Sequence, residues 1–301
     1  MPQTQSYTPP PPSQDPLGVL ASTAPVITAA EAVDLVRIDP AAVQAFAEQH
    51  TPFTAPRLSE DRLHATFLPP KRFCNYLLLL EALNFSFWDA EPRWRVDYQG
   101  AKHDGYWALV AALHRALREQ ALPLWDAHWM AQVDEAQMSA LLAGSGHPPP
   151  LLTERASHVR EVGEVLLTRW QGQFAELVAS CEGVAPRLAQ AIVDEFPSFR
   201  DEAVWRGQPV RFYKRAQIAV ADLSRLLPND PLGQFEGLEQ LTAFADYKVP
   251  QVLRREGLIV LSPPLAGRLE RLEELPPGSE DEVAIRAATL WACHLVAHAV
   301  Q

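Results

Sequence analysis

The sequence predicts a mainly α-helical protein with a single compact domain. Apolar residues recur at helical spacing along most of the chain, and 48% of the 301 residues are apolar, which is enough to bury a substantial core. Strand patterns are short: residues 94–98 alternate between apolar and polar, and residues 258–261 form one apolar run. The sequence contains no internal repeat, so we expect one helical body.

The first 25 residues have a different composition. They include the sequence YTPPPPSQDP, are rich in Pro, Ser and Gln, and lack an apolar period. We therefore expect a disordered tail over residues 1–25 and a helical domain over residues 26–301. The tail lacks the basic start and long apolar core of a signal peptide, and we expect no segment to span a membrane. These features predict a cytoplasmic protein.

Two amphipathic helices are predicted at residues 39–49 and 105–119, where apolar residues fall on one face. A loop rich in Gly and Pro at residues 144–150 precedes a long helical stretch at residues 154–180. Two glycines inside this stretch favour a bend or a break, because glycine is a poor helix former.

The last helix is predicted from its start signal. Ser279 followed by Glu282 forms a capping box, in which each side chain satisfies a main-chain N–H group at the start of the helix. Apolar residues then recur at helical spacing and predict a buried stripe. The stripe comprises Ile285, Ala288, Ala292, Leu295 and Ala299.

Cysteine usage and net charge narrow the function classes. Cys74, Cys181 and Cys293 are widely separated and have no metal-ligand spacing with other Cys or His, so we expect reduced thiols and neither a zinc site nor a disulfide framework. We also expect no metal ion and no cofactor. The net charge of −11 argues against binding to duplex nucleic acid, because such binding depends on many Lys and Arg contacts to phosphate.

One short segment is basic in this acidic chain. Residues 206–225 contain five cations and a single anion, Asp222. A patch of this size suits one phosphate group better than a nucleic acid strand, and Arg211 and Arg215 are candidate phosphate ligands. A solvated helix face is the alternative interpretation.

The segment FADYKVPQ, residues 244–251, lies where one helical pattern ends and another begins. Pro250 can open the second helix, and Val249 before it is disfavoured in a helical conformation. Asp246 is therefore expected in a short break, where main-chain N–H groups of the second helix can hold its carboxylate ionised. An ordinary helix cap with solvated neighbouring charges is the alternative interpretation.

Several segments, in order along the chain, resemble the queuosine salvage family of N-glycosidases, which release the 7-deazaguanine base queuine from its nucleotide. The resemblance covers roughly residues 60–300 and leaves out the N-terminal tail. The set of motifs is highly specific, although each motif alone is weak. The motifs are LNFSFW (83–88), GYWALVAALHRAL (105–117), ERASHVREVG, EFPSFRD, FYKRAQIAVADL (212–223), FADYKVPQ and IRAATLWA.

The resemblance implies an all-helical fold similar to base-excision DNA glycosylases. It also implies hydrolysis of queuosine 5′-phosphate, a small 7-deazaguanine nucleotide, to queuine and ribose 5-phosphate, so that queuine is salvaged for tRNA modification. Asp246 matches the family's catalytic aspartate, whose ionised carboxylate stabilises the cationic sugar and orients water. Lys214, in FYKRAQ, is the second candidate catalytic residue, either paired with Asp246 or donating to the departing base or sugar.

Recognition of a flat heterocycle needs aromatic walls and a few directed polar groups. The motifs supply both kinds of side chain, although core packing is the alternative role for each aromatic residue. The predicted substrate-binding residues are Asn84, Phe85, Phe87, Trp88, Asp104, Tyr106, Trp107, Glu154, Arg211, Arg215, Asp222, Tyr247 and Lys248.

Two residues depart from the family pattern. His103 precedes Asp104 where many relatives have a hydroxyl residue, and His114 stands where the helix often has Asn. The first departure affects the direction in which Asp104 points. For Arg286 and Trp291, in the last motif, helix packing is the expected role.

Two other functions stay open at this stage. One is a nucleosidase for free queuosine or another modified purine. The other is a non-catalytic helical module that binds tRNA or a protein partner. The basic patch with its adjacent aromatic residues suits an enzyme and a binding module equally, whereas the break at Asp246 favours the enzyme.

Overall fold

A computed structural model of the chain describes residues 7–29, 34–50, 63–87 and 91–300. The prediction of a mainly α-helical protein is confirmed, because helices account for most of the regular structure and the strands are three or four residues long. Contacts between Cα atoms divide the chain into two compact units. The first unit comprises residues 1–55, 201–217 and 239–301, and the second comprises residues 56–200 and 218–238.

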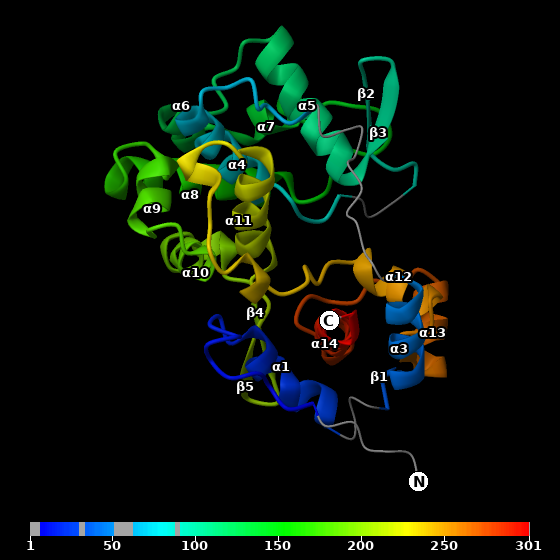
Figure 1. Cartoon of the computed structure of the whole chain (residues 1–301). Helices are drawn as coiled ribbons and strands as arrows, with labels where there is room; N and C mark the ends of the chain where they lie inside the picture. The colour runs from blue at the N-terminus through cyan, green and yellow to red at the C-terminus, as the bar shows by residue number, and fades with distance from the viewer. Residues whose placement is uncertain (1–6, 30–33, 51–62, 88–90, 301) are drawn as a thin grey trace. The chain divides into compact units, whose positions relative to one another are not determined.

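Helix α14 (Glu280–Val300) forms the centre of the first unit. Helices α1 (Val19–Thr28), α3 (Pro40–Gln49) and α12 (Val249–Arg255) contact it (Figure 1). The side chain of Asp39 caps α3, as predicted for the helix at residues 39–49. The other elements of this unit are β1 (Val36–Ile38), β4 (Glu202–Trp205), β5 (Gln208–Arg211), β6 (Ile259–Leu261) and α13 (Pro263–Glu270), with β1 antiparallel to β6 and β4 antiparallel to β5.

The prediction of a disordered tail is wrong from Val19 onward. Val19, Leu20 and Val26 of α1 are buried, and Thr23 Oγ1 accepts a hydrogen bond from Trp291 Nε1 at 3.1 Å. The carboxylate of Asp15 accepts hydrogen bonds from the main-chain nitrogens of Val19 and Ala21, which fixes the start of the helix. The apolar residues of α1 are too few to show a clear helical periodicity in the sequence, yet they complete the core around α14.

Helix α14 begins where the sequence predicts, but its buried face differs from the predicted stripe. Ser279 Oγ accepts from the main-chain nitrogen of Glu282, but the Glu282 carboxylate accepts from Gly278 rather than from Ser279. Of the predicted stripe, Ala288 and Ala292 are buried and Ala299 is exposed. The buried residues of α14 instead lie between Val283 and Ala292 and occupy more than one face of the helix, because several elements of the unit contact it.

By length and composition alone, α14 could cross a membrane, contrary to the expectation from the sequence. Half of its most apolar 18-residue window is buried inside the protein. The core helix of a globular protein passes the same test.

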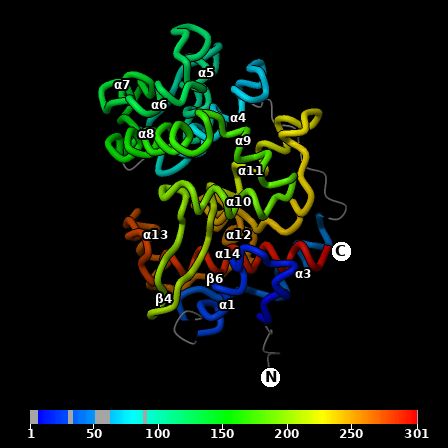
Figure 2. Tube along the Cα trace, turned by 90° about the vertical axis from the view of Figure 1, so that its left-hand side faces the viewer, coloured from blue at the N-terminus to red at the C-terminus, as the bar shows by residue number. Residues whose placement is uncertain are grey.

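In the second unit, α6 (Ala127–Gln132) and α7 (Glu135–Leu141) pack against α8 (Leu152–Arg169), as Figure 2 shows. Helix α4 (Pro70–Ala82) is buried on almost all sides, whereas α5 (Gly105–Glu119) has the predicted bounds and an amphipathic pattern. The remaining elements are β2 (Arg95–Tyr98), β3 (Ala101–Asp104), α9 (Phe174–Ser180), α10 (Ala185–Glu195) and the 3-10 turns η2 (Pro197–Phe199) and η3 (Pro231–Gly233).

The two glycines of the predicted helix at residues 154–180 have different roles. Gly172 ends the helical stretch with a φ of +75°, so α8 and α9 are separate helices. Gly163 lies inside α8 without breaking it. A Cβ atom there would lie 2.3 Å from the main-chain nitrogen of Ala131, so the glycine permits the close approach of α6.

The segment before Asp246 is not the predicted helix. Only the 3-10 turn η4 (Leu238–Gln240) is helical, and residues 242–246 have no regular structure. Val249 is already the first residue of α12, so the expected effect of Pro250 on its conformation is also wrong. Helix α11 (Lys214–Leu226) begins in the first unit and continues into the second.

Candidate functional site

The predicted site residues divide between the two units. Trp88 lies outside the described residues. In the first unit are Arg211, Lys214, Arg215, Asp246, Tyr247 and Lys248. In the second unit are Asn84, Phe85, Phe87, Asp104, Tyr106, Trp107, Glu154 and Asp222.

Asp246 lies in the predicted break and caps α12. Its Oδ1 atom accepts hydrogen bonds from the main-chain nitrogens of Lys248 at 2.7 Å and Val249 at 2.9 Å. Its own main-chain nitrogen donates to Phe244 O at 2.7 Å. The carboxylate is partly exposed. N–H groups at a helix N-terminus favour an anion, so the site holds an oriented carboxylate that solvent can reach.

Lys214 is the first residue of α11, and an aspartate fixes this end of the helix. Asp201 Oδ2 accepts from the main-chain nitrogen of Lys214 at 3.1 Å, and the main-chain oxygen of Asp201 accepts from Phe212 and Tyr213. Lys214 and Arg215 are both partly exposed. The two cations therefore lie in the first turn of a helix whose N–H groups also favour an anion.

Arg286 of α14 connects Asp201 with the Asp246 segment. Its guanidinium makes two hydrogen bonds to the Asp201 carboxylate, at 2.9 and 2.6 Å, and Nε donates to the main-chain oxygen of Ala245 at 3.1 Å. It also lies 3.8 Å from the centre of the Phe212 ring. The role expected from the sequence was helix packing. The structure shows that the Arg286 side chain also makes these polar contacts.

Arg211, Tyr247 and Lys248 are exposed. The main-chain nitrogen of Arg211 donates to Ser22 Oγ, which ties the end of β5 to α1. The ammonium of Lys248 lies 5.6 Å from the centre of the Tyr247 ring. These positions leave all three side chains accessible to a ligand at the surface of the first unit.

In the second unit, Tyr106 lies at the centre of a polar cluster. Its hydroxyl is 3.0 Å from His64 Nε2 and 3.5 Å from Asp222 Oδ2. Burial, together with the negative charges of Glu81 and Asp222, raises the pKa of Tyr106 well above its usual range. The phenol is therefore held protonated and can donate a hydrogen bond.

Asp222 is paired on its other oxygen, since Arg225 donates to Oδ1 from Nε at 3.2 Å and from Nη2 at 3.1 Å. Trp107 packs edge-on against His64, with ring centres 5.5 Å apart. Asp104, which precedes α5, is exposed, and its side chain makes no capping hydrogen bond to that helix. The cluster thus brings together Tyr106, Trp107 and Asp222, three of the predicted substrate-binding residues.

The LNFSFW segment is held by a fully buried arginine, Arg155 of α8. Its guanidinium donates to the main-chain oxygens of Leu83 at 2.8 Å and Phe85 at 2.6 Å, and also to that of Ser86. It lies 4.4 Å from the centre of the Phe85 ring and 5.9 Å from that of Phe87. Arg155 therefore supports this loop, whereas its neighbour Glu154 is exposed.

Glu81 is a buried carboxylate that the sequence analysis did not select. It is fully buried in α4, and Asn84 Nδ2 donates to its Oε2 atom at 2.8 Å. The sequence signal for Glu81 was a charged residue inside an apolar run. Charges are rarely buried without a specific reason, so this position could have been selected. His64 and Asp201 were also missed; Asp201 ends the EFPSFRD motif, which is the one signal that could have found it, whereas His64 has no marked spacing.

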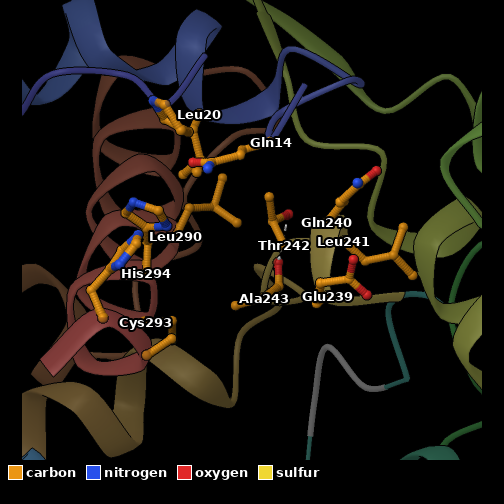
Figure 3. A pocket seen from close by; sticks show the side chains of 13 residues that line it. Gln14, Leu20, Glu239, Gln240, Leu241, Thr242, Ala243, Leu290, Cys293 and His294 are labelled. Carbon is orange, nitrogen blue, oxygen red and sulfur yellow. Dashed lines mark hydrogen bonds between the residues drawn. The ribbon is translucent and has the colours of Figure 1, made fainter. Parts of the chain in front are cut away.

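Two cavities, one within each unit, lie away from these groups. A cavity of about 580 Å³ in the first unit is bounded by α14 and the segment 239–243, with Leu290, His294 and Thr242 facing it (Figure 3). Another, of about 890 Å³, lies in the second unit beside Trp125 and Asn75. Neither is lined by Asp246 or Lys214. Within the described ranges, no three His, Cys, Asp or Glu residues are grouped to hold a metal ion.

The family model described as "Queuosine salvage protein" matches residues 64–301. This match includes all of the motifs that resemble the family and covers more than half of the chain. The chain belongs to the queuosine salvage protein family. Within the family, a protein from Sphaerobacter thermophilus named queuosine 5′-phosphate N-glycosylase/hydrolase is 48% identical over 282 residues, which are 92% of this chain and 84% of the relative.

Relatives with the same name occur in animals. The mouse protein is 38% identical over 73% of this chain, and the cattle protein is 35% identical over 74%. Each alignment covers 66% of the animal relative's length. The alignment with the bacterial queuosine salvage protein is longer than the family match, so that likeness extends into the segment before residue 64.

Proposed function

We propose that this protein hydrolyses the N-glycosidic bond of queuosine 5′-phosphate and releases queuine and ribose 5-phosphate. The names of its relatives support this substrate and reaction. The observation that carries the proposal is the carboxylate of Asp246, which the main-chain N–H groups of Lys248 and Val249 orient at the surface of the first unit. Queuine released in this way would be available for tRNA modification.

Cleavage of the bond between C1′ and the base nitrogen leaves positive charge on the ribose and negative charge on the base. Asp246 stabilises the cationic sugar and orients a water molecule, whose oxygen bonds to C1′. The proton lost by this water balances the charge on the departing base. Because a 7-deazapurine has carbon in place of N7, the enzyme cannot assist departure by protonating that position.

Lys214 is proposed to favour departure of the base electrostatically, either by donating a hydrogen bond or by holding Asp246 ionised. In the second unit, the protonated phenol of Tyr106 can donate and the carboxylate of Asp222 can accept a hydrogen bond; recognition of the base by these two residues stays a prediction from the sequence. Arg211 and Arg215 are proposed ligands of the 5′-phosphate. The protein is proposed to act on the small molecule rather than on duplex nucleic acid.

The proposal is tested by incubating the purified full-length protein with queuosine 5′-phosphate and following queuine and ribose 5-phosphate by mass spectrometry. We expect both products in equal amounts, and no base release from guanosine 5′-phosphate. Release of queuine from the free nucleoside alone would favour the nucleosidase alternative. Absence of queuine from both substrates would overturn the glycosidase assignment.

A further inference from the structure

We infer that the Arg286–Asp201 ion pair is a positioning device that fixes Lys214 and Asp246 with respect to one another. This inference rests on the proposed function, because it concerns the two residues assigned to catalysis. Neither Arg286 nor Asp201 is expected to contact the substrate. Their role is to set the main-chain positions from which the catalytic side chains extend.

The first half of the device is Asp201, which holds the start of α11. Its Oδ2 atom accepts the main-chain N–H of Lys214 at 3.1 Å, while its main-chain oxygen accepts the N–H groups of Phe212 and Tyr213. Three consecutive residues at the entry to the helix therefore bond to one aspartate. The backbone of Lys214 cannot shift without breaking this set.

The second half is Arg286, which holds the segment before Asp246. Nε donates to Ala245 O at 3.1 Å, and Ala245 is the immediate neighbour of Asp246. The segment from 242 to 246 has no regular structure, so its shape depends on such contacts. Arg286 is itself held by Glu282 one helical turn earlier, since Nη1 lies 3.3 Å from Glu282 Oε1.

The link between the halves is a bidentate ion pair. Arg286 Nη1 and Nη2 lie 2.9 and 2.6 Å from the two oxygens of Asp201, and both side chains are less than a quarter exposed. The planar guanidinium can bind a carboxylate with one edge and a carbonyl with Nε, a geometry that an ammonium cannot reproduce. Substitution by lysine therefore preserves the charge and removes the bridge.

The variant Arg286→Lys tests the inference against a matched control, Arg268→Lys. Arg268 of α13 pairs with Asp281 of α14, the helix that also carries Arg286. Among the described residues, Arg268 has no hydrogen bond to residues 212–217 or 244–248. We expect Arg286→Lys to lower kcat by about 10- to 100-fold, with KM changed by less than about threefold, because displacement of reacting groups by an ångström costs up to about 100-fold. Arg268→Lys should keep both constants near those of the wild type.

Asp201→Asn provides a second test if Arg286→Lys fails to fold. The amide keeps the shape and one acceptor oxygen but loses the charge, so kcat should fall with little change in KM. Equal kcat values for wild type and either of these variants, measured on folded protein, would overturn the inference. So would a raised KM with kcat unchanged, because that result would make the pair part of substrate binding.

Hydrogen exchange separates failure of this inference from failure of the proposed function. In Arg286→Lys, main-chain amides of residues 212–217 and 244–248 should exchange faster than in Arg268→Lys, whatever reaction the protein catalyses. Unchanged exchange in both segments would overturn the inference even if queuine is released. Faster exchange in a protein that releases no queuine would support the device and reject the proposed substrate.

Discussion

The Oδ1 atom of Asp246 lies 2.9 Å from the main-chain nitrogen of Val249, and the same oxygen accepts the N–H group of Lys248. One carboxylate oxygen therefore binds the two main-chain N–H groups at the start of α12, those of Lys248 and Val249. From the sequence alone, a helix cap and a catalytic carboxylate are alternative roles for Asp246. The geometry makes them compatible, because capping fixes the direction of the side chain and a helix N-terminus stabilises its negative charge.

Asp246→Asn should leave the fold intact and lower kcat by at least about 10³-fold, since the amide retains a capping oxygen but loses the charge that stabilises the sugar cation. Queuine release and the melting temperature measure the two effects. Asp39→Asn is the matched control, because Asp39 caps α3 through the same kind of Oδ1 contacts. Turnover of Asp246→Asn within a few fold of wild type would remove this residue from the mechanism.

Lys214→Met should lower kcat about 10²-fold with a smaller change in KM, if the ammonium acts mainly in the transition state. The hydrogen bond from its main chain to Asp201 does not depend on the side chain. Lys71→Met, which removes an exposed ammonium paired with Glu176, serves as a control. A raised KM with normal kcat would identify Lys214 as a substrate-binding cation instead.

Leu20→Ala in α1 should destabilise the protein by about 2–5 kcal/mol, because it removes a buried side chain from the core around α14. Leu272→Ala removes the same atoms from a side chain that is 88% exposed and should change stability by less than about 0.5 kcal/mol. Chemical denaturation measures both. Equal stabilities would mean that the N-terminal segment contributes little, as its composition first indicated.

The stability of the protein should depend on Asp201 in acid. Burial alone would raise the pKa of this carboxyl. The charge and hydrogen bonds of Arg286, together with the main-chain hydrogen bond from Lys214 and the charge of Arg215, outweigh burial and hold the pKa below its ordinary value of 3.8. A carboxyl with a depressed pKa in the folded state stabilises the fold above its unfolded pKa. That contribution is lost as pH falls through the folded pKa.

The difference in unfolding free energy between wild type and Asp201→Asn should therefore be constant above about pH 5 and shrink below about pH 4. Denaturant titrations at several pH values measure this difference. A difference that grows as the solution is made more acidic would contradict the depressed pKa of Asp201.

Sequence patterns predicted the elements whose signals are local. The helix at residues 105–119, the loop at 144–150 and the cap at Asp246 depend on periodicity, Gly/Pro content or nearby N–H groups, and all three occur. The helix predicted before Asp246 is absent, because the apolar residues there follow a helical spacing without forming a helix. Tertiary contacts with Arg286 and Gln217 take the place of helical hydrogen bonds there.

The supporting residues could not be predicted because their partners are remote in sequence. Arg155 bonds to carbonyl oxygens about 70 positions earlier, and Arg286 bonds to a carboxylate 85 positions earlier. Such pairs leave no spacing for a pattern to detect. Among the local signals, the burial of a charge within an apolar run, as at Glu81, could have been read from the sequence.

The 5′-phosphate of the substrate is expected to bind at Arg215 and Arg211. Arg215 lies in the first turn of α11, where a guanidinium and helix N–H groups can bind the same anion, whereas Arg211 is exposed at the end of β5. Binding energy from a phosphate is remote from the bond that breaks, so it can fix the ribose against Asp246 and raise kcat as well as lower KM.

We therefore expect kcat/KM for queuosine 5′-phosphate to exceed that for the nucleoside by about 10- to 100-fold, the range that one charged hydrogen-bonded contact supplies. Arg215→Ala should reduce this ratio strongly, and Arg211→Ala should reduce it less. Arg187→Ala, on α10 of the second unit, is the control, because its exposed side chain pairs with Glu182. The measurement is kcat/KM for both substrates at fixed salt. Equal values for the two substrates in the wild type would reject phosphate binding by this patch and leave the glycosidase reaction untouched.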